Sequence, residues 1–210
     1  DKRPYFADVL LGNLKTQRTI FYELMKSSGE LENNLVNVFN EYTTPYIKQG
    51  QGDIDLFYKK SIDTNTTKMF KGKFASQYIS KHIQEATWIS VVAETLDDNR
   101  IFFPTEKTGK ALMSCKPFIV LSGKHFLKNL RNIGFKTFHP IIDESYDLID
   151  NVELRTKSAY DSFFKLQKQD QNLVRQKLQD VLTHNERCMR DKSCLTINAR
   201  SMLNPLTTKV

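Results

Sequence analysis

The sequence predicts an α/β fold, in which a Rossmann-like parallel sheet is flanked by helices and followed by a long helical segment. Three observations lead to this prediction. Short apolar runs rich in β-branched residues alternate with amphipathic stretches of about ten residues, as in a parallel sheet with helical crossovers. Turns that contain glycine separate several of these runs. The 210 residues are 40% hydrophobic and 26% charged, which fits a globular chain with a sizeable core.

The first predicted unit is strand, helix, strand. Tyr5–Leu11 is a short apolar run that ends at a Gly-Asn turn. Lys15–Ser27 carries apolar side chains on one helical face, and Gly29 follows where such a helix ends. Leu35–Phe39 predicts the second strand. Residues 43–75 contain Gly and Thr-Asn clusters, so we expect loops with a short helix there.

The second unit repeats the alternation with clearer signals. We expect a helix over Phe74–Glu85. Trp88–Ala93 is an uninterrupted apolar run with several β-branched residues, which predicts a buried strand. A helix then begins at Thr105, whose hydroxyl can cap its first turn. Pro117–Leu121 predicts the next buried strand.

The rest of the chain becomes increasingly helical. A helix with an apolar face over residues 126–133 is expected to end at Gly134, where a C-terminal cap belongs. Phe135–Phe138 predicts a short strand. From Leu154 to Arg190 the pattern is mostly helical, and its polar face is dense with Lys, Gln and Asp.

Length and residue usage indicate how the chain is organised. We expect a Rossmann-like domain over residues 1–150 and a helical extension with a tail over residues 151–210. No apolar run is long enough to span a membrane, and the first residues do not form a signal peptide. The odd number of cysteines favours a reducing compartment, so we expect a soluble, cytoplasmic protein. Cys188 and Cys194 could pair if the protein were secreted.

The net charge of +7 suits an anionic partner, namely a nucleotide diphosphate, a nucleic acid or a membrane surface. Lys and Arg are spread along the chain without a dense block, so charge is the only support for nucleic-acid binding. No Cys or His residues have zinc spacing, and we expect no metal. The sequence also lacks the Walker loop and the G-x-G-x-x-G fingerprint of dinucleotide enzymes.

The segment that can carry chemistry follows the strand predicted at 88–93. Glu94 ends that strand, and Thr105, Glu106 and Lys107 open the next helix. Ligands of doubly wound sheets bind beyond the carboxyl ends of the strands. A helix N-terminus can hold a phosphate, Lys107 adds a full charge, and Glu106 can accept hydrogen bonds from sugar hydroxyls. Alternatively, Glu106 only stabilises the first helical turn and Lys107 is a solvated surface charge.

The stretch ISVVAET…FFPTEKTGKALMSCKPFIVLSG resembles the donor-nucleotide domain of glycosyltransferases with the GT-B fold, in particular the fucosyltransferase-like group of family 10. The matching residues are Glu94, Phe103, Thr105, Glu106, Lys107, Pro117 and Gly123. The resemblance covers residues 3–150 and is strongest over 88–147. The stretch SGKHFLKNLRNIGFKTFHPIIDESYDLIDN resembles glycosyltransferase-like proteins of bacteriophages and other viruses. The expected fold is then that of the C-terminal-type domain of GT-B enzymes.

The resemblance implies a substrate-binding role for five residues. Arg18 and Lys107 would contact the diphosphate of a nucleoside diphosphate sugar, and Glu106 would contact the ribose or the sugar. Glu94 would support the site, and Thr105 is the fifth expected substrate-binding residue. The implied reaction is an inverting transfer of the sugar to an unknown acceptor, without a cofactor or a metal.

The same resemblance leaves the catalytic base unassigned. In the family that base lies in a second domain, for which this chain has no room. We therefore expect a fragment that works with a second domain or partner chain, a reduced relative, or a protein that kept the fold and lost the activity. The alternative function is a non-catalytic binding or viral assembly module that reuses the fold. A viral protein of this kind would work in the host cytoplasm.

Overall fold

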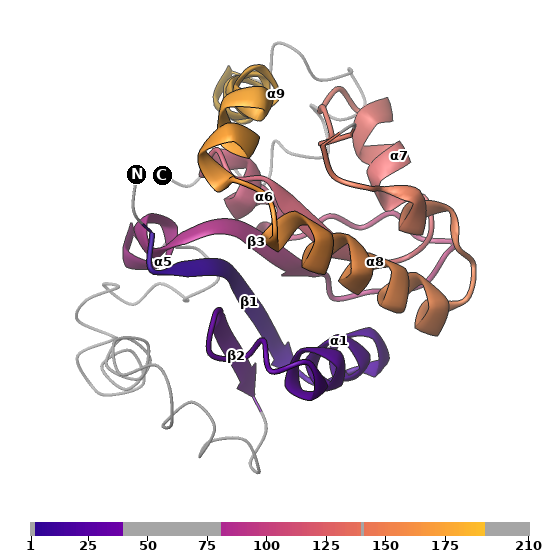
Figure 1. The fold of residues 1–210 in the computed structure, drawn as a ribbon. Helices are drawn as coiled ribbons and strands as arrows, with labels where there is room; N and C mark the ends of the chain where they lie inside the picture. The colour runs from indigo at the N-terminus through magenta and orange to yellow at the C-terminus, as the bar shows by residue number, and fades with distance from the viewer. Residues whose placement is uncertain (1–2, 40–80, 140, 192–210) are drawn as a thin grey trace, which may run out of the picture.

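The computed structural model describes residues 3–39, 81–139 and 141–191 (Figure 1). Four strands form one sheet in the order β2-β1-β3-β4, and every neighbouring pair is parallel. The strands are β1 (Tyr5–Asn13), β2 (Leu35–Phe39), β3 (Thr87–Ala93) and β4 (Phe118–Leu121). The predicted α/β class, the parallel sheet and its flanking helices are therefore confirmed. The loops expected over 43–75 lie outside the described residues.

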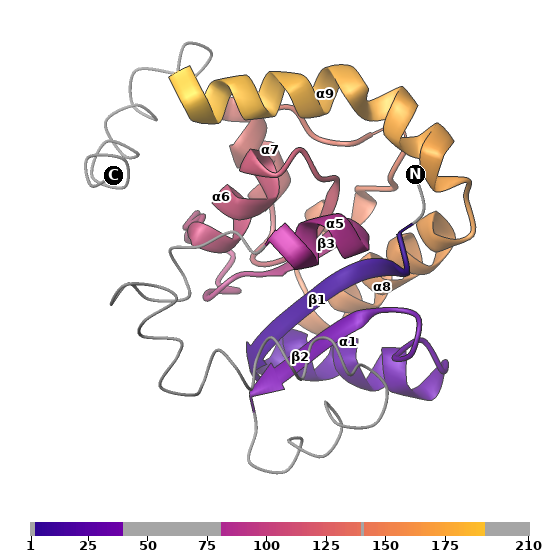
Figure 2. The same ribbon diagram turned by 90° about the vertical axis from the view of Figure 1, so that its left-hand side faces the viewer.

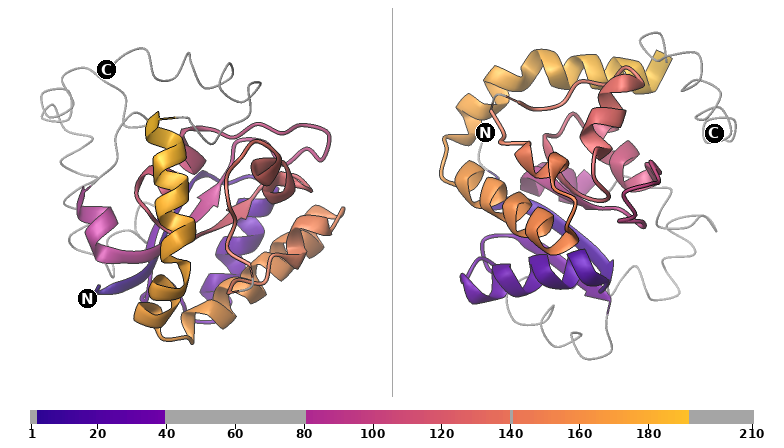
Figure 3. Two further views of the ribbon diagram at one scale, coloured as in Figure 1. Left: turned by 90° about the horizontal axis from the view of Figure 1, so that it is seen from above. Right: turned by 90° about the vertical axis from the view of Figure 1, so that its right-hand side faces the viewer.

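Helices cover the sheet and form its crossovers. They are α1 (Thr16–Ser27), α5 (Lys81–Ala86), α6 (Glu106–Met113), α7 (Phe126–Asn132), α8 (Val152–Gln167) and α9 (Gln171–Asp191), with a 3₁₀ turn at Ser145–Leu148. Helix α6 lies next to α9 (Figure 2), and α8 lies next to α1 (Figure 3). The helix predicted over Phe74–Glu85 is present from Lys81, and its earlier residues lie outside the described part. The long C-terminal helical segment is confirmed as two helices.

The chain changes direction in the sheet between β1 and β3. From β1 it crosses to β2 on one side, whereas β3 and β4 extend the sheet on the other side. Such a topological switch point is where open α/β sheets bind ligands, beyond the carboxyl ends of the strands. Helices α1 and α6 both begin at this edge, because each follows one of the two strands.

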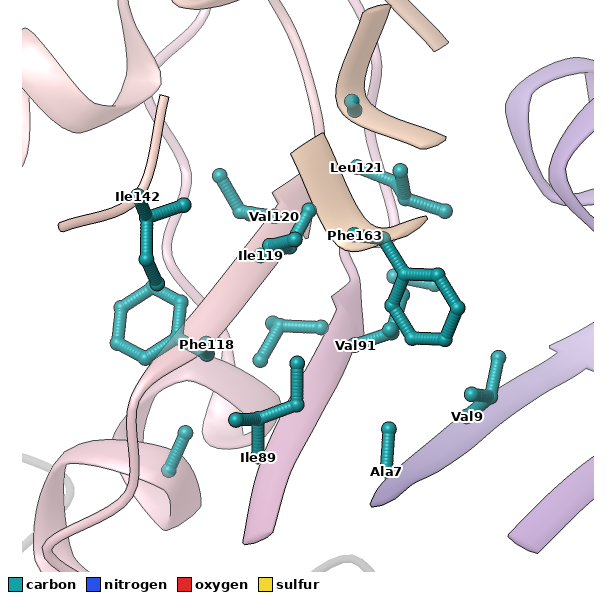
Figure 4. Close-up of a cluster of buried hydrophobic side chains, with 14 of the residues drawn as sticks. Ala7, Val9, Ile89, Val91, Phe118, Ile119, Val120, Leu121, Ile142 and Phe163 are labelled. Atoms are coloured by element: carbon teal, nitrogen blue, oxygen red, sulfur yellow. The ribbon is translucent and has the colours of Figure 1, made fainter. Parts of the chain in front are cut away.

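One hydrophobic core joins the sheet to both C-terminal helices. Strand β4 is buried over its whole length, and Phe163 of α8 lies over the central strands (Figure 4). The Phe163 ring meets Phe6 of β1 and Phe21 of α1 edge-on, at centroid distances of 5.2 and 5.5 Å. Leu178 and Leu182 of α9 are buried in the same core. Residues 152–191 are thus packed onto the sheet.

The short strand predicted at Phe135–Phe138 is wrong, because these residues form no strand. Side chains of other residues form hydrogen bonds with the backbone N–H and C=O groups of this segment. Asn185 accepts from Lys136 N at 2.8 Å and donates to Lys136 O at 2.9 Å, and Glu144 accepts from Phe138 N at 2.6 Å. The apolar pattern reflects burial instead, since Phe138 packs edge-on against Phe118 at 4.9 Å. An extended apolar segment without ladder partners satisfies its backbone through side chains.

The cysteines differ from the expectation of a fully reduced chain. Cys188 is disulfide-bonded, whereas Cys115 is a free, half-buried thiol. Cys194 lies outside the described residues. The Cys115 thiol donates to Glu186 Oε2 at 3.0 Å, and burial together with this carboxylate raises its pKa to about 11. None of the helices in the described ranges has the length and hydropathy that crossing a membrane requires.

A buried ion pair connects the sheet internally. Lys116, two residues before β4, donates to Asp8 of β1 at 2.8 Å, with side-chain exposures of 1% and 8%. The same Asp8 oxygen accepts from the hydroxyls of Thr87 and Ser90 on β3 at 2.8 and 3.0 Å. Burial lowers the pKa of Lys116, and the charge of Asp8 opposes that change. Strands β1 and β3 and the segment that leads into β4 therefore meet at one carboxylate oxygen.

Replacing Lys116 by Met should destabilise the fold strongly, because it leaves Asp8 buried without its counter-charge. We expect a loss of about 3–5 kcal/mol in the free energy of unfolding, measured by urea denaturation at pH 7. The double variant Asp8→Asn/Lys116→Met should recover part of this loss, since Asn accepts from Thr87 and Ser90 without a charge. A single variant as stable as the wild type would show that the pair contributes nothing.

Candidate functional site

Glu94 joins the end of β3 to the start of α6. Its carboxylate is fully buried and accepts three hydrogen bonds: from Thr105 N at 3.0 Å and from the hydroxyls of Thr105 and Thr108 at 2.5 Å each. Its backbone N–H donates to Leu121 O of β4 at 3.0 Å. A carboxylate at a helix N-terminus satisfies otherwise unbonded donors there and complements the helix dipole. Glu94 therefore fixes where α6 begins.

The Thr-Glu-Lys segment forms the first turn of α6, as predicted. Thr105 is extended and caps the helix, its hydroxyl accepting from Lys107 N at 3.3 Å. The Lys107 ammonium lies near the Thr105 hydroxyl at 3.4 Å and Glu106 Oε1 at 3.3 Å. The Lys107 and Glu106 side chains are 30% and 43% exposed, so a ligand in solution can reach both.

A second lysine reaches the same place from the other strand at the switch point. Lys15 stands immediately before α1, and its ammonium donates to Thr95 O at 2.9 Å. Lys107 donates to the hydroxyl of the same Thr95 at 3.2 Å. We call Lys15, Thr95, Thr105 and Lys107 the two-lysine site. It brings two ammonium groups together at the carboxyl ends of β1 and β3.

The N-terminus of α1 adds to the positive potential of the two-lysine site. The N-cap position of α1 makes no side-chain capping bond, and the first turn of α1 contains no acidic residue. The first N–H groups of a helix have no partner within the helix and carry partial positive charge. The site therefore combines mobile ammonium donors with fixed backbone donors, a combination that suits a phosphate.

Arg18 lies behind the two-lysine site. It is buried, and its guanidinium donates to Ala93 O at 3.1 Å and to Glu94 O at 2.8 Å. Burial lowers the pKa of Arg18, whereas the charges of Glu94 and Asp97 raise it. These bonds hold α1 against the end of β3. A direct contact between Arg18 and a diphosphate remains a prediction.

Gln17, in the first turn of α1, is a buried polar side chain without a hydrogen bond. It is 1% exposed, and neither its amide oxygen nor its amide nitrogen has a partner. An unsatisfied buried amide costs about 1–3 kcal/mol. Residues that cost stability without a visible gain are expected next to functional sites. Nothing in the sequence pattern marked Gln17, which lies within a helix predicted from its apolar face.

An open cavity of about 460 Å³ lies beside the loop that joins β3 to α6. It is lined by Asp97, Asp98, Asn99, Arg100, Asp150, Val152 and Arg155. The guanidinium of Arg155, one of these lining residues, donates to the carbonyl oxygens of Ser122, Ile149, Asp150 and Asp97 at 2.7–3.3 Å. Gly123 allows its segment to pass close to the backbone of Asp98, because a Cβ at this position would overlap the Asp98 carbonyl. These contacts position the loop that carries Thr95.

The structure places all five predicted site residues at one edge of the sheet. Thr105, Glu106 and Lys107 are at the surface of α6, whereas Glu94 and Arg18 are buried behind it. Sequence analysis did not single out Lys15 or Thr95, although a lysine just before the first crossover helix was a usable signal. Within the described ranges, no group of His, Cys, Asp and Glu side chains could hold a metal ion. Comparison with protein-family models, curated proteins and solved structures finds no match to this chain.

Glu94→Gln should lower the free energy of unfolding by about 1–3 kcal/mol, because an amide cannot accept all three hydrogen bonds as the carboxylate does. Urea denaturation measures the change. The matched control is Glu106→Gln, one residue past the cap that Glu94 holds, where an exposed side chain should change stability by less than about 0.5 kcal/mol. Equal effects of the two substitutions would contradict a bracing role for Glu94.

Gln17→Met should stabilise the fold by about 1 kcal/mol, because it removes an unsatisfied amide and keeps the shape of the side chain. Thermal and urea unfolding both report the change. Gln176→Met on the exposed side of α9 is the control and should be nearly neutral. Destabilisation by Gln17→Met would mean that the amide is satisfied in solution.

Proposed function

We propose that this chain binds the diphosphate of a nucleoside diphosphate sugar and acts as the donor-binding domain of a glycosyltransferase. The observation that carries the proposal is the convergence of Lys15 and Lys107 on Thr95, at the switch point of a parallel sheet. This position is where open α/β sheets bind nucleotides. The resemblance to family 10 donor domains adds the sugar and the transfer reaction to the proposal.

The diphosphate would lie between the starts of α1 and α6. Lys15 and Lys107 would both approach it, and the free N–H groups of the first turn of α1 would donate to its oxygens. Lys107 would exchange its present bonds to Thr95 and Thr105, both longer than 3.1 Å, for bonds to phosphate. Glu106, next to Lys107 and exposed, is available to accept from ribose or sugar hydroxyls.

The proposed chemistry requires stabilisation of the leaving group. When the bond between the anomeric carbon and the diphosphate oxygen breaks, negative charge grows on the diphosphate. The two ammonium groups, already bonded to the phosphate oxygens, would neutralise that charge as it grows, which is how charges placed in advance lower a barrier. Arg18 and Glu94 would keep this edge rigid through their bonds to β3 and α6. A general base would come from a second domain or a partner chain.

A thermal-shift screen with GDP, UDP, ADP and CMP tests the proposal. One diphosphate at 100 times its dissociation constant should stabilise the wild type by about 2.7 kcal/mol. CMP should bind more weakly, because it carries one phosphate. Lys15→Ala and Lys107→Ala should each weaken binding about tenfold, the equivalent of one lost charge-assisted bond.

The control for these variants is Lys177→Ala, which removes an exposed lysine of α9 far along the chain from the site. It should bind the nucleotide as the wild type does. If no nucleotide shifts the unfolding temperature at millimolar concentration, the chain does not bind the donor nucleotide by itself. The hypothesis of a non-catalytic binding module is then favoured. If Lys15→Ala and Lys107→Ala both bind normally, the nucleotide binds elsewhere.

A further inference from the structure

The open cavity beside the loop from β3 to α6 is not used by the proposed diphosphate site. We call it the Asp97 cavity, and its volume is about 460 Å³. It lies beyond the carboxyl ends of β3 and β4, because Asp97 stands four residues after β3 and Arg155 donates to the carbonyl oxygen of Ser122, the first residue after β4. A few hundred Å³ is the usual size of a small-molecule site, and this edge is where open α/β sheets bind ligands.

Hydrogen bonds between two segments of the chain hold the walls of the Asp97 cavity. The Arg155 guanidinium donates to the carbonyl oxygens of Asp97 and Asp150, and thereby joins the loop after β3 to the start of α8. The Asn99 amide donates to the same Asp150 oxygen at 2.9 Å. The cavity is therefore formed before a ligand arrives, and a ligand loses little affinity to ordering the protein.

The charges around the Asp97 cavity compensate one another. The lining carboxylates and the cations that line the cavity or pair with them are equal in number: Asp97, Asp98 and Asp150 against Arg100, Lys124 and Arg155. Asp98 pairs with Arg100 at 2.7 Å, and Asp150 pairs with Lys124 at 2.9 Å. Because the summed charge is zero, the cavity has little long-range attraction for an ion, and a neutral polar ligand suits it better.

The carboxylate of Asp97 differs from the other two. It is half-buried and makes no hydrogen bond or ion pair within the described ranges, whereas the carboxylates of Asp98 and Asp150 are both bonded. An ionised carboxylate can accept several hydrogen bonds. Arg100 uses Nε and one terminal nitrogen on Asp98, so its other terminal nitrogen can donate to a ligand. Val152 adds an apolar surface to the same lining.

We propose that the Asp97 cavity binds a sugar, whose hydroxyl groups donate to the Asp97 carboxylate and accept from Arg100. Val152 would lie against the C–H face of the sugar ring, where apolar surface leaves water. A sugar is neutral, carries several donors and acceptors, and has an apolar face, so it matches each feature of the cavity. The proposal does not depend on the two-lysine site, because a free sugar has no phosphate.

The sugar has two possible sources. Thr95 of the two-lysine site stands two residues before Asp97, so their Cα atoms are at most about 7 Å apart. The cavity therefore holds either the sugar of a nucleoside diphosphate sugar bound at the two-lysine site or part of a separate carbohydrate.

Nuclear magnetic resonance of the isotope-labelled chain tests the proposal with free monosaccharides. Glucose, galactose, mannose and N-acetylglucosamine are titrated to millimolar concentration, and at least one should shift the backbone amide signals of Asn99 and Val152. Asp97→Asn should weaken that binding about tenfold, because it removes the charged acceptor. Asp180→Asn changes an exposed acid of α9 and is the matched control, which should bind as the wild type does.

Filling the cavity tests the same site by a steric route. Val152→Phe should weaken sugar binding, because the larger ring occupies the space of the ligand. Leu154→Phe adds a ring on the same turn of α8 but outside the lining, at a side chain that is 57% exposed, and should leave binding unchanged. Far-UV circular dichroism confirms that each variant is folded.

Nucleotide sugars separate the two sources of the sugar. Calorimetry compares UDP-glucose with UDP, and GDP-mannose with GDP. If Asp97→Asn weakens the binding of a nucleotide sugar and leaves that of its nucleoside diphosphate unchanged, the cavity holds the sugar of the donor. If only the binding of free monosaccharides depends on Asp97, the cavity holds a separate carbohydrate.

Two outcomes overturn the proposal. In the first, neither monosaccharides nor nucleotide sugars bind in a way that depends on Asp97. In the second, the diamine putrescine binds at Asp97 and no sugar does, which would show that the carboxylate attracts a cation. Failure of every nucleoside diphosphate to bind counts against the two-lysine site alone, since the free monosaccharides still test the cavity.

Discussion

The buried contact between Lys116 and Asp8 is the constraint on which the sheet depends. A lone charge at either position would be costly in a core this dry, so each residue requires the other. The pair links the segment before β4 to β1, and the hydroxyls of Thr87 and Ser90 bring β3 to the same oxygen. Strand order and register at the centre of the sheet are thus tied to one polar network. The apolar faces around it contribute burial without this directional specificity.

Glu94 connects the sheet to the candidate site. Glu94 follows the last residue of β3, and both of its carboxylate oxygens accept hydrogen bonds from the first turn of α6. Arg18 does the same for α1 through the carbonyl oxygens of Ala93 and Glu94. Both helices therefore begin side by side, and Lys15 and Lys107 meet at Thr95. The surface cations depend on two buried charged residues that lie behind them.

Much of the fold could be predicted from the sequence, because its signals are local. The uninterrupted apolar runs at 88–93 and 117–121 indicated buried strands, and Thr105 was recognisable as a helix cap. The strand predicted at Phe135–Phe138 failed for a non-local reason. Asn185 of α9, 49 residues along the chain, forms hydrogen bonds with the backbone N–H and C=O of Lys136. No pattern within residues 135–138 could reveal this partner. Apolar spacing reports burial and does not identify the hydrogen-bond partner.

The sequence by itself determined the α/β class, the alternation of strands and helices, and the Thr105–Lys107 segment as the start of a helix, since periodicity and capping act over a few residues. The tertiary structure alone decided that Lys15 joins Lys107 at Thr95 and that Arg18 and Glu94 face inward. Lys15 is 80 residues from Thr95 in the chain, and Arg18 is 76 residues from Glu94. Their proximity follows from strand order and helix packing, which are properties of the folded chain as a whole.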